Sequence, residues 1–447
     1  FPTTPPCRRW EGPVAFRAAT RLLRRGVYGR APALVAMWSF LLTATCLGQW
    51  PQWRGPTRDG HVRAAPRQAA WPERLSLVWE HEVGGGYAGP VGDEEYLYVH
   101  SRQGGREAVT CLRLSNGDVV WRQSYDAPFR QDRSGTAHGQ GPYSTPALSG
   151  GRLFTFGVRG ILIAWDAATG RRLWTKDSAW EFTHPFPAFG EALSPLVWGD
   201  LCFVHFGGHD RDRYDHYREG AMIALNVADG RERWRWTREA APIGASPMIC
   251  EFDGQPHLVF KGKRGIFGLN PRNGWQLWEI PYEVSQDNTI VTPVCAGNLL
   301  VTSDFDWGMA SWRIRLVDGR GSAEQIWKHR RASLFTSTPV VVNDVLVGFS
   351  HFRRGQLFGL DPATGQVLWD GAPRSGEHAS LLAWGGDLMY FREDGSIVVG
   401  PVDREAFRPR RTYAVGGDFA WTHPAVIGDR IVVRDGNRLR VYSLAGR

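Results

Sequence analysis

The stretch LDPATGQVLW, residues 360–369, decides the fold of this chain. An apolar residue leads into a turn that starts at Asp361 and ends at Gly365, and an apolar strand carrying Trp369 follows. Glycine supplies the positive φ that a tight hairpin needs, and Asp bonds the local backbone. The stretch therefore predicts two antiparallel strands, the second marked by tryptophan.

The same pattern recurs along the chain. Copies stand at 114–121 (LSNGDVVW), 165–174 (WDAATGRRLW), 225–234 (LNVADGRERW) and 269–278 (LNPRNGWQLW), and a looser copy ends at Trp327. The strand tryptophans are Trp79, Trp121, Trp174, Trp234, Trp278, Trp327 and Trp369, at spacings of 42, 53, 60, 44, 49 and 42 residues. These spacings are typical of β-propeller blades, so we expect each tryptophan to dock between neighbouring blades and the longer units to carry extra loops.

A second signal precedes each tryptophan strand: a segment of the form Ser/Thr-x-Pro, or close to it, that leads into two further strands. Its eight copies end at Pro90-Val91, Pro146, Pro195, Pro247, Pro293, Pro339 and Pro424, and at Ala379-Ser380-Leu381, where the proline is lost. Each unit thus contains four strands, and the units number eight.

The two ends of the repeat complement each other. Residues 75–83 form a tryptophan strand with no strands before it, while the last unit, from Trp421 to Leu444, has no tryptophan strand after it. We therefore predict an all-β, eight-bladed β-propeller of four-stranded blades, in which the N-terminal strand completes the C-terminal blade and so covers both edges. The alternative is seven blades and a loose hairpin, because the seventh unit is degenerate between Pro401 and Tyr413.

The first residues resemble an export signal. Residues 1–36 hold seven Arg and one acid, which account for +6 of the net charge of +8, and an uncharged apolar run follows from Ala31 to Leu47. We expect a leader at 1–48 with a signal peptide at about 24–48, an N-terminal extension at 49–74 and the propeller at 75–447, exported to the periplasm or cell envelope. A membrane-spanning helix is the alternative, and Cys46 leaves lipidation open. The nearly balanced charge of the body argues against nucleic-acid binding.

Four cysteines lie beyond the leader, singly within apolar runs: Cys111, Cys202, Cys250 and Cys295. An even count in an exported protein permits disulfides. Since the four fall in different repeats without a shared spacing, we expect buried free thiols.

The turn-and-tryptophan pattern resembles the pyrroloquinoline-quinone (PQQ) repeat of quinoprotein alcohol dehydrogenases and of the assembly lipoprotein BamB. The segments WPQWRGPTRDG (50–60), GQGPYSTP (139–146) and WTHPAVIGDRIVVR (421–434) also resemble landmarks of exported bacterial PQQ-binding-like propeller proteins. That resemblance covers residues 50–444. It implies the propeller fold and export, and it carries over no catalytic residues.

Enzymatic chemistry finds little support in the sequence. A quinoprotein dehydrogenase of the resembled kind needs Ca²⁺ ligands, a carboxylate base and a vicinal Cys-Cys pair, and the chain has no Cys-Cys. One cluster has metal-binding residue types, namely His205, His209, Asp210, Asp212, Asp215 and His216. Interleaved arginines favour a solvated hairpin there, so we predict no metal site.

Ligands of propellers usually meet the loops at the mouth of the central channel. Residues three to five positions before the repeat proline are expected to face it: Tyr87, Tyr143, Glu191, Asn288, Phe335, His378 and Trp421. We therefore expect a monomeric, non-enzymatic envelope scaffold that binds an envelope protein or a small ligand. The alternatives are a PQQ- or metal-dependent oxidoreductase that uses the channel, and a BamB-like partner in outer-membrane assembly.

Overall fold

The computed structural model describes residues 48–63, 71–177, 181–182, 188–208, 220–282, 289–330, 332–417 and 421–445. The chain divides into a unit of residues 1–45, which lies outside the described residues, and a unit from Cys46 to Arg447. Everything below concerns the second unit. Within the part described, no helix is long and apolar enough to cross a membrane.

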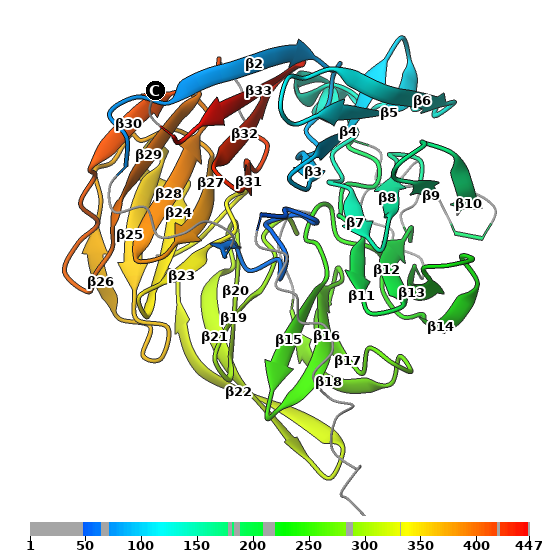
Figure 1. The fold of residues 1–447 in the computed structure, drawn as a ribbon. Helices are drawn as coiled ribbons and strands as arrows, with labels where there is room; N and C mark the ends of the chain where they lie inside the picture. Colours follow the sequence, from blue (N-terminus) through cyan, green and yellow to red (C-terminus); the bar gives the residue numbers. More distant parts are fainter. Residues whose placement is uncertain are drawn as a thin grey trace, which may run out of the picture. The chain divides into compact units, whose positions relative to one another are not determined.

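Eight antiparallel sheets surround a common axis, as Figure 1 shows, and each supplies one blade. Blade 1 holds β3 (Val91–Gly92), β4 (Tyr96–Gln103), β5 (Arg106–Arg113) and β6 (Val119–Tyr125). Blade 2 holds β7 (Ala147–Ser149), β8 (Arg152–Phe156), β9 (Ile161–Asp166) and β10 (Arg172–Asp177). Blade 3 holds β11 (Leu196–Trp198), β12 (Leu201–Phe206), β13 (Ala221–Asn226) and β14 (Glu232–Trp236). Blade 4 holds β15 (Met248–Phe252), β16 (Gln255–Lys261), β17 (Gly265–Leu269) and β18 (Gln276–Pro281).

The other four blades repeat this order from the innermost strand outward. Blade 5 holds β19 (Val294–Ala296), β20 (Leu299–Asp304), β21 (Gly308–Val317) and β22 (Arg320–His329). Blade 6 holds β23 (Val340–Val342), β24 (Val345–Ser350), β25 (Gln356–Leu360) and β26 (Val367–Asp370). Blade 7 holds β27 (Ala379–Trp384), β28 (Asp387–Arg392), β29 (Ser396–Pro401) and β30 (Arg411–Ala414). Two short 3₁₀ helices, η1 (Arg133–His138) and η2 (Phe352–Arg354), lie in loops.

Blade 8 joins the two ends of the repeat. It holds β31 (Ala425–Ile427), β32 (Arg430–Asp435) and β33 (Arg438–Ser443), with β2 (Ser76–Glu82) paired antiparallel to β33. The predicted eight-bladed propeller and its closure by the N-terminal strand are confirmed. The seven-bladed alternative is wrong, because blade 7 has four strands despite its degenerate sequence.

Each repeat glycine is held by the tryptophan of the preceding blade. Gly170 has φ +72°, and a Cβ there would lie 2.6 Å from the Trp121 ring. The Trp121 Nε1–H donates to Ala167 O over 2.9 Å, across the blade boundary. Equivalent bonds run from Trp79 to Leu114 O, Trp174 to Val227 O, Trp234 to Pro271 O, Trp327 to Pro362 O and Trp369 to Asp403 O. Trp278 differs, since its Nε1–H donates to His257 Nδ1 within its own blade.

The Ser/Thr-x-Pro segments make a second set of contacts, closer to the axis. The Thr145 N–H donates to Ser194 Oγ (3.0 Å), the Ser194 N–H to Ser246 Oγ (2.9 Å), and the Ser246 N–H to Thr292 Oγ1 (2.9 Å). The repeat hydroxyls of Ser194, Ser246 and Thr292 therefore each accept a hydrogen bond from the blade before. This explains the Ser or Thr of the motif in these blades.

A disulfide joins Cys250 on β15 to Cys295 on β19, with Cα atoms 6.1 Å apart. The expectation of a free thiol is wrong for these two residues. Innermost strands of neighbouring blades approach each other near the axis, and both cysteines follow their repeat proline by two or three residues. Cys111 and Cys202 are free and buried.

Residues 50–62 cross the axis at the centre of the ring (Figure 1, dark blue). The segment bonds to blade 1 through Trp50 N and Gly92 O (2.8 Å), to blade 2 through Leu148 N and Pro51 O (2.7 Å), and to blade 7 through Ala383 N and Gly60 O (2.8 Å). β1 (His61–Val62) adds a parallel strand to β27. The segment thus fastens blades that lie far apart around the ring.

Two buried arginines anchor this segment through backbone carbonyls. Arg58 donates to Pro195 O (2.7 Å) and Ser194 O (3.1 Å) of blade 3, and Arg54 donates to Pro339 O (2.7 Å) of blade 6. Both residues have a left-handed backbone, with φ near +61°. Burial lowers the pKa of Arg54 to about 10 and that of Arg58 to about 9, so both remain charged at neutral pH.

Arg58→Ala should lower the free energy of unfolding by about 2–4 kcal/mol, because two buried carbonyls lose a charged donor. Urea-induced unfolding followed by tryptophan fluorescence measures the change. Arg63→Ala is the matched control, since Arg63 is exposed and pairs with Asp59 at the surface, and we expect a change within about 0.5 kcal/mol. Equal losses in the two variants would contradict the anchoring role of Arg58.

Candidate functional site

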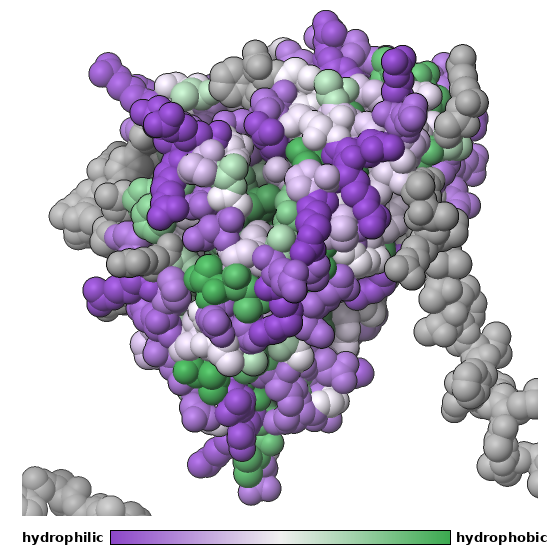
Figure 2. Space-filling view, turned by 90° about the vertical axis from the view of Figure 1, so that its left-hand side faces the viewer, coloured by the Kyte–Doolittle hydropathy of each residue, from purple (hydrophilic) through white to green (hydrophobic). Residues whose placement is uncertain are grey.

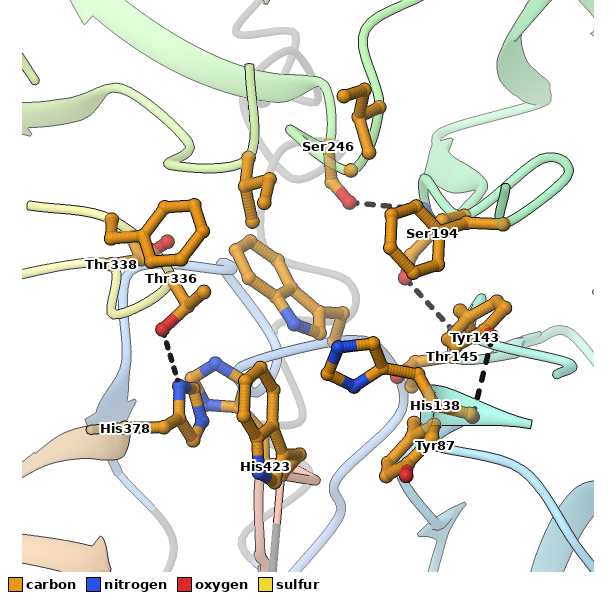
Figure 3. A pocket seen from close by; sticks show the side chains of 18 residues that line it. Tyr87, His138, Tyr143, Thr145, Ser194, Ser246, Thr336, Thr338, His378 and His423 are labelled. Atoms are coloured by element: carbon orange, nitrogen blue, oxygen red, sulfur yellow. Dashed lines mark hydrogen bonds between the residues drawn. The ribbon is translucent and has the colours of Figure 1, made fainter. Parts of the chain in front are cut away.

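A cavity of about 280 Å³ lies on the axis, and Figure 3 shows its walls. We call it the axial cavity. Its lining residues are Trp53, Tyr87, His138, Tyr143, Thr145, Phe189, Ala192, Ser194, Ile243, Gly244, Ser246, Ile290, Phe335, Thr336, Thr338, His378, Trp421 and His423. The lining comes from all eight blades and from the crossing segment, which contributes Trp53.

The repeat places one residue of each blade in this wall. The position three residues before the repeat proline, or before Leu381 where the proline is lost, lines the cavity in every blade. The eight residues are Tyr87, Tyr143, Ala192, Gly244, Ile290, Thr336, His378 and Trp421. Each blade therefore places the same repeat position in the wall of the cavity, and the blades differ in which side chain occupies it.

Among the residues expected at the channel mouth, Tyr87, Tyr143, Phe335, His378 and Trp421 line the axial cavity. Glu191 does not line it: this residue is buried one position away, where Oε1 accepts a hydrogen bond from Gly207 N (2.9 Å). Asn288 lies outside the described residues. The position three residues before the proline also brings Ala192, Gly244, Ile290 and Thr336 into the wall, and none of these four was predicted from the sequence.

Two residues that line the cavity could not be predicted from the repeat. Trp53 comes from the crossing segment, and His138 comes from η1 in the loop between blades 1 and 2. The His138 ring lies 5.1 Å from Trp421 and 5.7 Å from Phe189. The excess length of this unit predicted an extra loop, but nothing in the sequence indicated that the loop returns to the axis.

Aromatic rings dominate the geometry of the wall. Tyr87 and Tyr143 stack with centroids 5.6 Å apart and planes at 7°. His378 and Trp421 stack at 5.0 Å and 9°. Such surfaces offer flat faces to a planar ligand.

The polar groups of the wall are neutral. Burial lowers the pKa of His378 to about 4 and holds the pKa values of His138 and His423 below their usual range. None of the described lining residues is Asp, Glu, Lys or Arg. Thr336 Oγ1 lies 2.9 Å from His378 Nδ1, and His423 Nδ1 has no hydrogen-bond partner among the described residues. A ligand that carries polar atoms could therefore satisfy His423.

Positive charge lies beneath this neutral wall. The guanidinium carbons of Arg54 and Arg58 are 5.6 and 5.5 Å from the Trp53 ring centroid. Trp53 also meets His423 edge to face at 5.3 Å. The axial cavity thus ends on an aromatic floor with two buried cations beside it.

The cluster weighed as a weak metal candidate falls mostly outside the described residues, which include none of His209, Asp210, Asp212, Asp215 and His216. His205 is described: it is buried on β12, with Nε2 3.0 Å from Glu239 O. Burial lowers its pKa to about 4. Within the described parts of the chain, no group of three or more His, Cys, Asp or Glu side chains could hold a metal ion.

Comparisons with known proteins agree with this architecture. The family model described as outer membrane protein assembly factor BamB matches residues 124–371. The BamB of Burkholderia pseudomallei is 26% identical over 381 residues, covering 75% of this chain and 88% of that protein. A polyvinylalcohol dehydrogenase from Sphingopyxis is 22% identical over 389 residues, 79% of this chain, and the chain spans about half of that longer relative (54%).

Solved structures share the fold. BamB from Moraxella catarrhalis aligns with a TM-score of 0.56 at 17% identity, covering 83% of this chain and 99% of that one. The quinohemoprotein alcohol dehydrogenase ADHIIG from Pseudomonas putida aligns with a TM-score of 0.64 at 13% identity, covering 90% and 81%. At these identities the likeness establishes the propeller and leaves the function open.

Glu191 should make stability depend on pH. Burial raises its pKa from 4.5 to about 7, so ionisation costs free energy only in the folded state. This part of the stability is complete below about pH 4.5 and is lost as the pH rises to about 7. Glu191→Gln should therefore match the wild type near pH 4.5 and be more stable at pH 8, by up to about 3 kcal/mol.

Denaturant unfolding at a series of pH values tests this expectation. Comparison with the wild type isolates Glu191 from other titrating groups. Glu251→Gln, at an exposed position on β15, controls for the removal of a carboxylate. Parallel pH profiles for the wild type and Glu191→Gln would contradict the argument.

Proposed function

The chain belongs to the family described as outer membrane protein assembly factor BamB, and we propose that it is a non-enzymatic propeller of the cell envelope that binds a small ligand in its axial cavity. The observation that carries this proposal is the blind end of the cavity. Residues 50–62 cross the axis, so the cavity ends on Trp53 beneath a ring of neutral aromatic and hydroxyl side chains. Largely preformed, mostly apolar cavities with a few convergent polar groups are typical of small-molecule sites.

A quinone-dependent enzyme would need particular residue types in the wall of the axial cavity. Such an enzyme requires carboxylate oxygens for Ca²⁺ and a carboxylate base near the reacting atoms. The described lining offers no carboxylate, and the buried Glu191, next to Ala192 of the wall, accepts a hydrogen bond from Gly207 N. The residues present do not fit this cofactor, and we derive no reaction through it.

An absorption spectrum of the purified protein, before and after addition of PQQ and Ca²⁺, separates the two roles. We expect no dye-linked oxidation of alcohols or sugars, with or without the added PQQ and Ca²⁺. A chromophore bound one to one, together with such oxidation, would replace the binding role by an oxidoreductase role.

A BamB-like role in outer-membrane assembly is the other alternative, and family membership favours it. It requires a surface for a protein partner, and a large contiguous patch of exposed apolar residues is one feature that marks such a surface. The side face visible in Figure 2 is mainly hydrophilic, with hydrophobic residues in small separate areas. Among the described residues the exposed large apolar side chains are Leu77, Val78, Val119, Val120, Trp275, Val317 and Phe352. The axial cavity is the more developed site.

Filling the cavity should abolish ligand binding without removing a native contact. We expect the neutral aromatic probe N-phenyl-1-naphthylamine to bind the wild type one to one, and Ala192→Phe to weaken it at least tenfold, because the new ring occupies its place. Probe fluorescence and equilibrium dialysis measure the affinity and the stoichiometry. Circular dichroism checks that the variant keeps its fold.

Trp275→Ala is the matched control, since Trp275 is 74% exposed and lies outside the axial cavity. This variant should bind the probe as the wild type does. Binding that survives in Ala192→Phe, or that is lost in Trp275→Ala, would show that the probe uses another surface and would refute the proposed site.

A further inference from the structure

A second hollow, of about 710 Å³, opens beside the axial cavity and shares Phe335 and Trp421 with it. We call it the outer hollow. Its other lining residues are His351, Arg354, Arg374, Gly376 and Glu377, from the loops that follow β24 and β26. A ligand in the axial cavity can therefore extend into this hollow without leaving the site.

The two loops that carry the arginines are locked to each other. The Arg374 N–H donates to Arg353 O (3.1 Å), and the Ser375 N–H donates to Gly355 O (3.0 Å). A Cβ on Gly355 would lie 1.7 Å from Gly376 O, so the backbones touch in a way that only glycine allows. Arg354 and Arg374 are therefore held at fixed positions on the same hollow.

The backbone at these arginines is also unusual. Arg353, Arg354 and Arg374 have φ values of +55°, +62° and +60°, in the left-handed region that long side chains rarely adopt. Such strain persists where the surrounding structure imposes it, and it gathers at binding sites. Here it falls on the two residues that bring positive charge to the outer hollow.

The lining of the outer hollow contains more positively charged side chains than negatively charged ones. Among the described residues, neither Arg354 nor Arg374 forms an ion pair, and both are exposed. Glu377 is the one acid among the described lining residues, against two guanidinium groups. His351 Nδ1 is buried and has no hydrogen-bond partner within the described parts of the chain. The hollow thus offers two cations and an unsatisfied ring nitrogen beside the carboxylate of Glu377, and the Glu393 carboxylate next to it accepts a hydrogen bond from Glu377 N (2.8 Å).

Aromatic rings connect this charge to the axial cavity. Phe352, which is 43% exposed, lies 4.4 Å from the His351 ring, and His351 stacks on Phe305 at 4.4 Å. Phe305 in turn contacts Phe335 at 4.9 Å, and Phe335 lines both spaces. The aromatic rings of Phe335 and Trp421 are therefore available to a flat apolar group at the junction of the two spaces, and the arginines lie at the outer end.

We propose that Arg354 and Arg374 form an anion-recognition rim, and that the ligand is a small aromatic acid. Its ring enters the axial cavity, and its carboxylate, sulfonate or phosphate stays in the outer hollow between the two guanidinium groups. Arginine presents planar donor pairs that match these anions. The inference rests on the proposed function and adds the class of ligand.

Two probes with the same aromatic skeleton test the rim. The dye 8-anilinonaphthalene-1-sulfonate carries a sulfonate that N-phenyl-1-naphthylamine lacks. We expect the sulfonate probe to bind the full-length wild type about tenfold more tightly than the neutral probe at low ionic strength. The preference should shrink as salt is added, because the rim is open to solvent.

The double variant Arg354→Gln/Arg374→Gln should lose this preference and keep the affinity for the neutral probe within twofold. Arg353→Gln is the matched control: Arg353 has the same type, exposure and backbone conformation as Arg354 but does not line the outer hollow. It should bind both probes as the wild type does.

The possible outcomes separate the two proposals. If both probes bind with equal affinity, or if the double variant keeps the sulfonate preference, the rim is refuted while the cavity stands. If Arg353→Gln loses the preference as fully as the double variant, diffuse surface charge is responsible and the rim is likewise refuted. If the neutral probe fails to bind the wild type, the cavity proposal fails first.

Discussion

The structure depends on a contact between neighbouring blades: the tryptophan of one outermost strand lies over the turn glycine of the next blade. The contact needs a ring on one side and a residue without a side chain on the other, as at Trp121 and Gly170. The indole N–H then donates a hydrogen bond to a carbonyl of the same turn. This bond sets the orientation of the ring, and the contact with glycine sets how closely the ring approaches the next blade. Repetition of one contact with one geometry gives each blade the same rotation, and a constant rotation closes into a ring. In blade 7, whose outermost strand has no tryptophan, the Tyr413 hydroxyl donates to Pro72 O, a few residues before the strand that closes the ring.

A closed ring of equal blades leaves an axis along which identical registers meet. This geometry brings the residue three before each repeat proline into one wall, whatever its side chain. The crossing of residues 50–62 then turns an open channel into a cavity with a floor. The crossing is stabilised by Arg54 and Arg58, which donate hydrogen bonds to carbonyls of blades 6 and 3. Burying an unpaired guanidinium group costs free energy, and the hydrogen bonds to main-chain oxygens offset part of that cost.

The sequence predicted what repeats and missed what occurs once. The turn glycines, the strand tryptophans and the complementary ends of the repeat sufficed for the blade count and the closure. The wall was found in part, at Tyr87, Tyr143, Phe335, His378 and Trp421, because the repeat proline marks the register approximately. Trp53 and His138 could not be found, since each belongs to a segment outside the repeat whose path depends on long-range contacts. The Cys250–Cys295 disulfide was missed for a related reason. The two cysteines stand at different distances from their repeat prolines, yet they meet because the innermost strands of neighbouring blades converge near the axis.

The repeat that builds the ring also determines what the cavity can recognise. The hydroxyls of Thr145, Ser194, Ser246 and Thr338 each accept a backbone N–H from another blade, which uses an oxygen lone pair and leaves the O–H free to donate. These four residues line the cavity, so the structural bonds turn a ring of hydroxyls into a ring of donors. The described lining thus has hydrogen-bond donors and no carboxylate, so it favours ligands that carry many acceptor atoms. The guanidinium groups beside Trp53 add to this preference. Burial also lowers the pKa values of the histidines in this lining, so their rings are neutral at neutral pH. The proposed binding of an aromatic molecule would therefore use donors that the joining of the blades has already placed in the wall.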